Sequence, residues 1–345
     1  MRALALDGAG GLERLALRDL PAPQIAGRTD VRVQVRMAAL NRLDLFVIGG
    51  LPGVEYGGPH IIGSDAAGIV DQVGPDVRSV AVGDRVMINA GLACGRCPVC
   101  LDGEEPLCRD FRVLGEHVAG TAAEYVVLPE TNVAKVPEAM PWDRAAAFSL
   151  ATLTAWRMLT TRAALRPGEA VLIWGIGGGV AQAALRIAKL LGAFAIVTSG
   201  SDDKLAAARA LGADAIVNHA TGDVVAEVRR HTGGRGADVI VDSVGERSWN
   251  HSLRALRRGG RLVVCGATTG PQVAIDLRRL FWHQWSLLGS TMGSRREYAE
   301  IVRLATQGHL WPDVDGVVPL DEAVGALARL AAGKQFGKIV IEVSK

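Results

Sequence analysis

The sequence lacks a strong excess of either charge and lacks long apolar runs. Its 38 Lys and Arg against 36 Asp and Glu give a formal net charge of +2, and no basic block would follow a phosphate backbone. No stretch approaches the roughly eighteen apolar residues of a membrane span. Asp7 and Glu13 interrupt the apolar residues at the N-terminus, which argues against a signal peptide. We therefore expect no nucleic-acid partner, no membrane contact and a cytoplasmic protein.

Tyrosine and cysteine are also scarce. None of the three tyrosines has a lysine four positions later, which excludes the Tyr-Lys pair of short-chain reductases. Four of the five cysteines stand at Cys94, Cys97, Cys100 and Cys108. In a reducing compartment such a cluster is more typical of a metal site than of two disulfides or four free thiols.

The patterning changes near Trp156. At 345 residues the chain has the length of about two domains. Up to about residue 150, short alternating runs separated by glycine and proline predict a twisted, barrel-like β-domain. Beyond it, apolar strands alternate with amphipathic helices, which predicts a doubly wound α/β domain with a parallel sheet. We expect one of these helices to reach Arg258 and the valine-rich end, residues 337–345, to return to the β-domain.

A strand, a glycine turn and a helix follow one another in residues 171–193, "VLIWGIGGGVAQAALRIAKLLGA". Glycines in this context let a pyrophosphate approach the backbone at the helix N-terminus, so the segment predicts a dinucleotide site. Two registers fit, Gly175-Gly177-Val180 and Gly178 followed by Ala181. We prefer the second, because alanine replaces the packing glycine of the motif more readily than valine does.

The end of the next strand favours NADPH over NADH. An NAD site carries an acid about 20 residues beyond the glycines, whereas this chain has Ser199 there. Small residues up to Ser201, with Lys204 close by, leave space and donors for a 2′-phosphate. Asp202 and Asp203 either reach the ribose or serve the start of the next helix, and we expect the second role.

The chain resembles the medium-chain dehydrogenase/reductase superfamily, which contains the zinc alcohol dehydrogenases and the quinone oxidoreductases. The resemblance rests on "GSDAAGIVDQVGPDV", "VGDRV", the cysteine spacing, "TAW" and the glycine-rich turn. It implies an α/β protein with a GroES-like twisted β-barrel catalytic domain in residues 1–152 and 294–345 and a Rossmann NADP(H)-binding domain in residues 153–293. It also implies a zinc lobe near residues 92–110. Four thiolates leave no open coordination position, so we expect one structural Zn²⁺ per subunit on Cys94, Cys97, Cys100 and Cys108.

The resemblance breaks at the catalytic zinc. Relatives hold that ion with a cysteine, the histidine of a Gly-His-Glu motif, and a second cysteine or an acid. The matching positions here are Asn41, Ser64 and Leu150, which are poor zinc ligands. Asp65 stands in the place of the glutamate. A zinc-dependent alcohol dehydrogenase would need His60 or His117 as a substitute ligand, and we expect His60 to be a surface or structural histidine.

The remaining resemblance is to quinone oxidoreductases and enone reductases. It implies NADPH-dependent hydride transfer to a quinone or an α,β-unsaturated carbonyl, with hydrogen-bond donors for the carbonyl oxygen in place of a metal. Asn41 and Ser64 are the candidate donors. Asp44 either orients a ligand or caps a turn, and Thr154 is expected beside the nicotinamide. A zinc alcohol dehydrogenase and a non-catalytic NADPH-binding protein remain the alternatives.

The remaining expectations concern the cofactor, the substrate and the assembly. Most candidate cofactor residues follow the carboxyl ends of the predicted parallel strands, where such folds bind ligands. The candidates are Gly177, Gly178, Gly179, Val180, Ser199, Gly200, Ser201, Lys204, Ser243, Val244, Cys265, Gly266, Ala267, Ser290, Thr291 and Lys338. We expect the Cys265 thiol to serve packing rather than reactivity. We expect a small carbonyl or quinone substrate and, by analogy, a homodimer or homotetramer.

Overall fold

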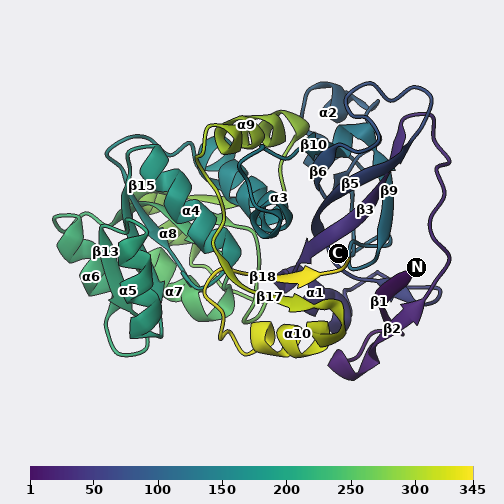
Figure 1. Ribbon diagram of the computed structural model, residues 1–345. Helices are drawn as coiled ribbons and strands as arrows, with labels where there is room; N and C mark the ends of the chain where they lie inside the picture. The colour runs from purple at the N-terminus through teal and green to yellow at the C-terminus, as the bar shows by residue number, and fades with distance from the viewer. Residues whose placement is uncertain (345) are drawn as a thin grey trace. The chain divides into compact units, whose positions relative to one another are not determined.

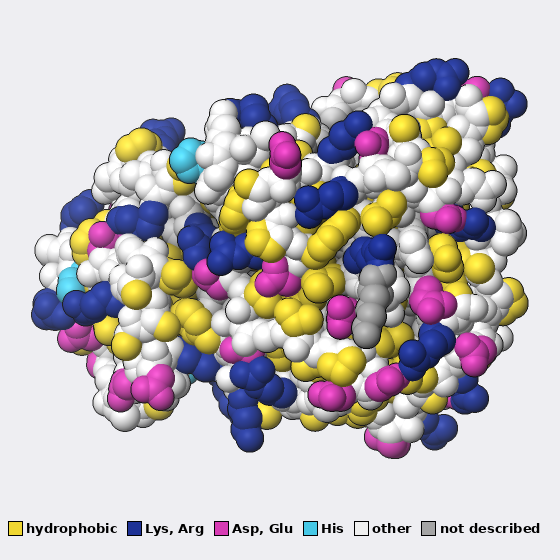
Figure 2. All heavy atoms as spheres, viewed as in Figure 1, with side chains coloured by type: hydrophobic (Ala, Val, Ile, Leu, Met, Phe, Trp, Pro, Cys, Tyr) yellow, Lys and Arg dark blue, Asp and Glu magenta, His cyan; other side chains and the backbone are white. Residues whose placement is uncertain are grey.

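The computed structural model describes residues 1–344 and divides into two compact units, residues 1–151 with 293–345 and residues 152–292. Lys345, the last residue of the expected catalytic domain, lies outside the described residues. Within the described part, none of the helices has the length and apolar character needed to cross a bilayer. Figure 2 shows basic and acidic side chains interleaved over the face in view.

The first unit is built mainly on antiparallel strands, with β17 and β18 paired in parallel. Its strands are β1 (Arg2–Leu6), β2 (Leu15–Asp19), β3 (Asp30–Ala39), β4 (His60–Ile61), β5 (Asp65–Val73), β6 (Arg85–Ile88), β7 (Gly91–Leu92), β8 (Arg112–Val113), β9 (Tyr125–Pro129), β10 (Val133–Lys135), β17 (Val314–Pro319) and β18 (Lys338–Glu342). Its helices are α1 (Arg42–Gly49), α2 (Pro98–Leu101), α9 (Arg295–Thr306) and α10 (Ala323–Ala331), and α3 (Trp142–Trp156) runs across the division between the units.

Strand β3 is the centre of this unit. Val31, Val33 and Val35 are fully buried on one face while the residues between them are partly exposed, as the alternating sequence predicts. It pairs with β5, β9 and β18 in a seven-stranded sheet. Figure 1 shows the yellow β18 beside β3, so the end of the chain does return to the β-domain. This pairing brings Lys338 close to the residues that follow β3.

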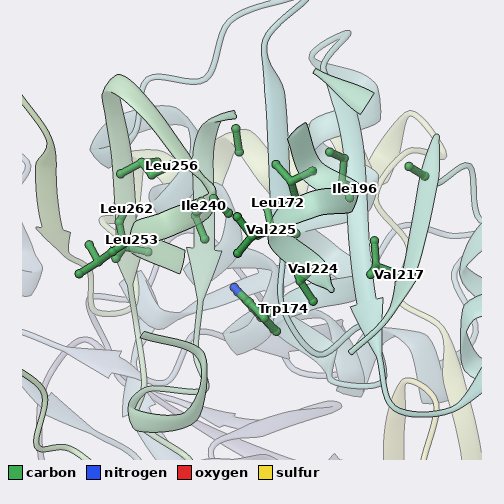
Figure 3. Close-up of a cluster of buried hydrophobic side chains, with 14 of the residues drawn as sticks. Leu172, Trp174, Ile196, Val217, Val224, Val225, Ile240, Leu253, Leu256 and Leu262 are labelled. Atoms are coloured by element: carbon green, nitrogen blue, oxygen red, sulfur yellow. The ribbon is translucent and has the colours of Figure 1, made fainter. Parts of the chain in front are cut away.

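The second unit is a parallel sheet with flanking helices (Figure 1). Its strands are β11 (Ala170–Ile173), β12 (Phe194–Ser199), β13 (Ala215–Asn218), β14 (Ala237–Asp242), β15 (Leu256–Val264) and β16 (Ser286–Gly289), and its helices are α4 (Gly179–Leu190), α5 (Asp202–Ala210), α6 (Val224–His231), α7 (Glu246–Ala255) and α8 (Leu277–His283). The order β13-β12-β11-β14-β15-β16 is doubly wound, with β11 and β14 at the point where the winding reverses. Figure 3 shows the apolar core that holds sheet and helices together.

One helix boundary in this unit was predicted wrongly. We expected a helix to reach Arg258, but α7 ends at Ala255 and β15 begins at Leu256. The backbone pairs Ala237 with Leu256 and then Val239 with Arg261, so the intervening residues form an irregularity in the strand. The buried Leu256 side chain holds the start of the strand in place. The sequence does not indicate this burial, because Leu256 is followed by two arginines.

Candidate functional site

Four cysteines converge in a short lobe of the first unit. The sulfur atoms of Cys94 and Cys108 are 3.5 Å apart, and those of Cys97 and Cys100 are 3.4 Å apart. All four sulfurs lie within 4.8 Å of one another. Sulfurs bound to one zinc at about 2.3 Å in a tetrahedron are about 3.8 Å apart, so this set fits zinc. Because all four positions are taken by sulfur, such a zinc would hold the lobe together without binding substrate.

The backbone favours the thiolate form of Cys94, whereas burial raises the pKa of Cys100 to about 12. The N–H groups of Arg96 and Cys97 point to the Cys94 sulfur and lower its pKa to about 6. In residues 1–344 no other group of three or more His, Cys, Asp or Glu side chains is arranged to hold a metal. The histidines proposed as substitute ligands serve the fold instead. His60 is buried, stacks on Tyr56 and lies 2.9 Å from the Gly115 carbonyl oxygen, while His117 accepts the Val113 N–H.

A second group of polar side chains, which we call the Lys338 cluster, consists of Asn41, Asp44, Asp65 and Lys338. All four are buried in the first unit. Asp65 Oδ2 accepts from Asn41 Nδ2 at 3.0 Å and from Lys338 Nζ at 2.9 Å, and Lys338 Nζ also donates to Asn41 Oδ1. Asp65 Oδ1 accepts the Leu150 N–H at 2.7 Å. Two of the three positions that hold the catalytic zinc in relatives are therefore tied to Asp65.

The two predicted substrate donors are engaged within the protein. Asn41 Nδ2 donates to the Ala39 carbonyl as well as to Asp65. The Ser64 hydroxyl, which is fully buried, donates to the Leu114 carbonyl at 2.7 Å. Either residue would have to leave these partners to donate to a substrate.

Asp44 caps the start of α1. Its Oδ2 accepts the Asn41 N–H at 2.7 Å, while its Oδ1 is buried without a hydrogen-bond partner. Burial raises the pKa of Asp44 to about 6, against the opposing effects of the Asn41 N–H and the Lys338 charge. Of the two roles considered for this residue, the capping role is the one seen.

The glycine turn of the second unit suits a phosphate. Gly175 has a φ of +69°, a conformation that favours glycine, and Gly178 is the N-cap of α4 with no side chain capping the helix. The N–H groups of Gly179 and Val180 open the helix, where such groups have no partner within the helix and bind anions. Ala181 is buried in the first turn, as the second register requires.

The segment after β12 begins a helix. Ser201 caps α5 by accepting the Lys204 N–H, and Asp202 and Asp203 stand in the first turn. Asp202 also accepts from Asn218 Nδ2 at 2.7 Å. The expected helix-start role of these acids is therefore seen, and β12 ends at Ser199 with Gly200 exposed beside it.

The turn after β14 is held by Asp242, which the sequence analysis missed. Its buried carboxylate accepts from the N–H groups of Val244 and Gly245 and from the hydroxyls of Ser248 and Ser252. An acid at the end of an apolar strand, "VIVD", followed by a glycine turn was the available signal. The carboxylate shapes the turn that contains Ser243 and Val244.

The remaining predicted cofactor residues lie at the same edge of the second unit. Cys265, Gly266 and Ala267 follow β15, and Ser290 and Thr291 follow β16. Burial raises the pKa of Cys265 to about 12, which makes it a poor nucleophile. Ser290 Oγ is buried without a hydrogen-bond partner among the described residues.

Two predicted residues lie elsewhere. Thr154 is buried in α3, and Lys338 lies in the first unit with its ammonium in the cluster. The fit of these residues to a nicotinamide cofactor remains a prediction.

Comparison with known proteins agrees with this geometry. Residues 27–138 match the family model described as alcohol dehydrogenase GroES-like domain, and residues 179–307 match zinc-binding dehydrogenase. A curated NAD-dependent alcohol dehydrogenase of Sulfolobus acidocaldarius is 32% identical over 351 residues and is covered completely, as is this chain. A curated acryloyl-coenzyme A reductase of Sulfurisphaera tokodaii is 26% identical, covering 94% of this chain and 96% of its own.

A solved structure described as an NAD-dependent alcohol dehydrogenase is 45% identical over the whole of both chains, with a TM-score of 0.95. The four-cysteine lobe, the parallel sheet and these relatives all point the same way. The chain belongs to the zinc-type medium-chain dehydrogenase/reductase superfamily, with a GroES-like domain and a Rossmann-type nucleotide-binding domain, and is an oxidoreductase.

Proposed function

We propose that the chain is an NADPH-dependent reductase of a quinone or an α,β-unsaturated carbonyl compound and uses no catalytic metal. The observation that carries the proposal is the Lys338 cluster. The Asn41 and Asp65 side chains are hydrogen-bonded to each other and to Lys338. The Ser64 hydroxyl donates to the Leu114 carbonyl. These side chains form a closed hydrogen-bond network rather than a set of zinc ligands.

Reduction of an activated double bond suits such a site. The cofactor supplies a hydride, and the negative charge then develops on the carbonyl oxygen, which needs a positioned donor in a place shielded from water. The relative named as an acryloyl-coenzyme A reductase is consistent with this substrate class. The names of other relatives favour a second candidate, an alcohol dehydrogenase.

The NADPH assignment rests on the segment from Ser199 to Lys204. The last residue of β12 is a serine rather than an acid, and the carboxylate of the nearest acid, Asp202, accepts a hydrogen bond from Asn218. Ser199, Gly200 and Ser201 at the strand end are small residues, of which Ser199 is buried and Gly200 is exposed. The relatives named NAD-dependent make a direct comparison of both cofactors necessary.

The test is a substrate panel with both cofactors. Purified chain is mixed with NADPH or NADH and with quinones, enals, enones, an enoyl thioester and simple aldehydes, and cofactor absorbance is followed. We expect a higher kcat/KM with NADPH, turnover of the conjugated substrates, and about one zinc per chain. Two zinc ions per chain with chelator-sensitive turnover of alcohols would favour the alcohol dehydrogenase instead.

We also propose a homodimer or homotetramer. Strand β16 lies at the edge of the parallel sheet, and the preceding helix α8 exposes Leu277, Phe281 and Trp282. Apolar side chains next to an unpaired strand edge are typical of an interface between copies. Light scattering of wild type and Trp282→Lys checks this, and a monomeric wild type would contradict it.

A further inference from the structure

Lys338 holds its ammonium group inside the protein. The side chain is only 4% exposed, and Nζ donates to Asp65 Oδ2 at 2.9 Å and to Asn41 Oδ1. An ammonium has three hydrogens, and the described residues offer Nζ no third acceptor. One N–H of Lys338 is therefore left for a ligand.

The other donors of this region have no hydrogen to spare. Asn41 gives both amide hydrogens to Ala39 and Asp65, and Ser64 gives its hydroxyl hydrogen to Leu114. Ser64 and Asp65 are also 0% exposed, whereas Asn41 retains 7%. Lys338 alone in this group combines an uncommitted N–H with some exposed surface.

The position of the ammonium is fixed before any ligand arrives. Its two acceptors come from different segments, and Lys338 itself begins β18, which pairs with β3 and β17. Asp65 balances the charge of the ammonium, and its carboxylate is itself held in place by N–H groups of Leu150 and Asn41. A cationic donor held in this way needs little reorganisation when charge develops next to it.

We propose that the Lys338 ammonium donates the hydrogen bond that stabilises the negative charge on the substrate's carbonyl oxygen. This inference rests on the proposed function. The β-carbon gains a hydride, the double-bond electrons move toward the carbonyl oxygen, and a proton from water completes the α-carbon. Lys338 keeps its proton throughout and acts by hydrogen bonding and charge.

The first experiment replaces Lys338 with methionine, which keeps most of the side-chain volume. We expect kcat for the best conjugated substrate to fall by about 100-fold or more, comparable to losing one oxyanion donor. We expect the Kd of NADPH, measured by calorimetry without substrate, to change by less than about threefold. An unchanged kcat overturns the proposal, and so does a weaker Kd with unchanged kcat, which would make Lys338 a cofactor ligand.

A double variant separates catalysis from folding. Lys338→Met leaves the Asp65 carboxylate buried without its cation, which lowers Tm. Lys338→Met with Asp65→Asn removes both charges, so we expect Tm to rise toward the wild-type value while kcat stays low. Recovery of kcat together with Tm would reduce Lys338 to a structural role and overturn the inference.

The wild-type chain distinguishes this inference from the proposed function. If it binds NADPH but oxidises it with none of the carbonyl compounds or quinones, the proposed function fails, and the inference with it. If wild type is active and Lys338→Met is equally active, only the role of Lys338 fails.

Discussion

The cysteine lobe and the Lys338 cluster are two side-chain clusters of the first unit that differ in their fit to a metal ion. In the lobe, four sulfurs converge within 4.8 Å of one another, and the arrangement fits zinc. In the cluster, Asn41 stands at a position where relatives hold the catalytic zinc, and the Lys338 ammonium donates both to Asn41 and to the neighbouring Asp65. The difference between the two clusters is that one offers only sulfur ligands, whereas the other contains its own cation.

The largest expected effect comes from breaking the lobe. Cys100→Ser should reduce zinc from about one per chain to almost none and lower Tm by about 10 °C or more, because bound structural zinc contributes folding free energy. Zinc is measured by elemental analysis and Tm by calorimetry. Cys265→Ser is the matched control, since its sulfur lies in the other unit and should leave zinc unchanged. Full zinc in Cys100→Ser would show that the four sulfurs do not act as one site.

A smaller effect should separate the cluster from the lobe by its response to pH. The folded pKa of Asp44 is about 6, above its ordinary value of 3.8, so folding favours the protonated form. Below pH 3.8 Asp44 makes its full contribution to the free energy of unfolding. As pH rises through about 6 this contribution is lost, by about 3 kcal/mol in total at about 1.4 kcal/mol per pH unit. Asp44→Asn keeps an acceptor for the Asn41 N–H without the charge and should lack this fall.

Urea unfolding of both proteins between pH 4.5 and 8 measures the difference. We expect the free energy of unfolding of Asp44→Asn, relative to wild type, to increase as pH rises and to stay constant above about pH 7. Both proteins carry the same cysteines, so loss of zinc in acid affects them alike. A difference that does not change with pH would show that Asp44 does not titrate in this range.

The smallest expected effect comes from breaking the hydrogen bond between the cysteine lobe and helix α9. Glu105, buried in the lobe, accepts the Arg295 N–H at the start of α9 at 3.3 Å. Glu105→Ala should cost about 1 kcal/mol and leave zinc in place, because only one hydrogen bond is lost. Glu105→Gln keeps an acceptor and should stay close to wild type. Loss of zinc in Glu105→Ala would mean that zinc binding by the lobe requires the hydrogen bond to α9.

The parts of the fold that were predictable have local causes. Alternating valines placed β3, and apolar strands followed by amphipathic helices placed the parallel sheet. The end of α7 was mistaken because the burial of Leu256, which starts β15, depends on the neighbouring strand rather than on its own sequence. Asp242 was missed because its four donors become neighbours only when the turn folds around the carboxylate.

The sequence by itself placed the four cysteines and the glycine turn, and it predicted that the catalytic zinc ligands are absent. Residue type and short spacing suffice there, because the ligands of the lobe lie within one short loop. Only the tertiary structure showed which partners engage Asn41, Ser64 and Asp65. Lys338 and Asn41 are separated by 297 positions, and the pairing of β18 with β3 joins them. Whether a buried donor is free depends on such distant partners, so a sequence can name Asn41 as a donor but cannot show that its hydrogens are already taken.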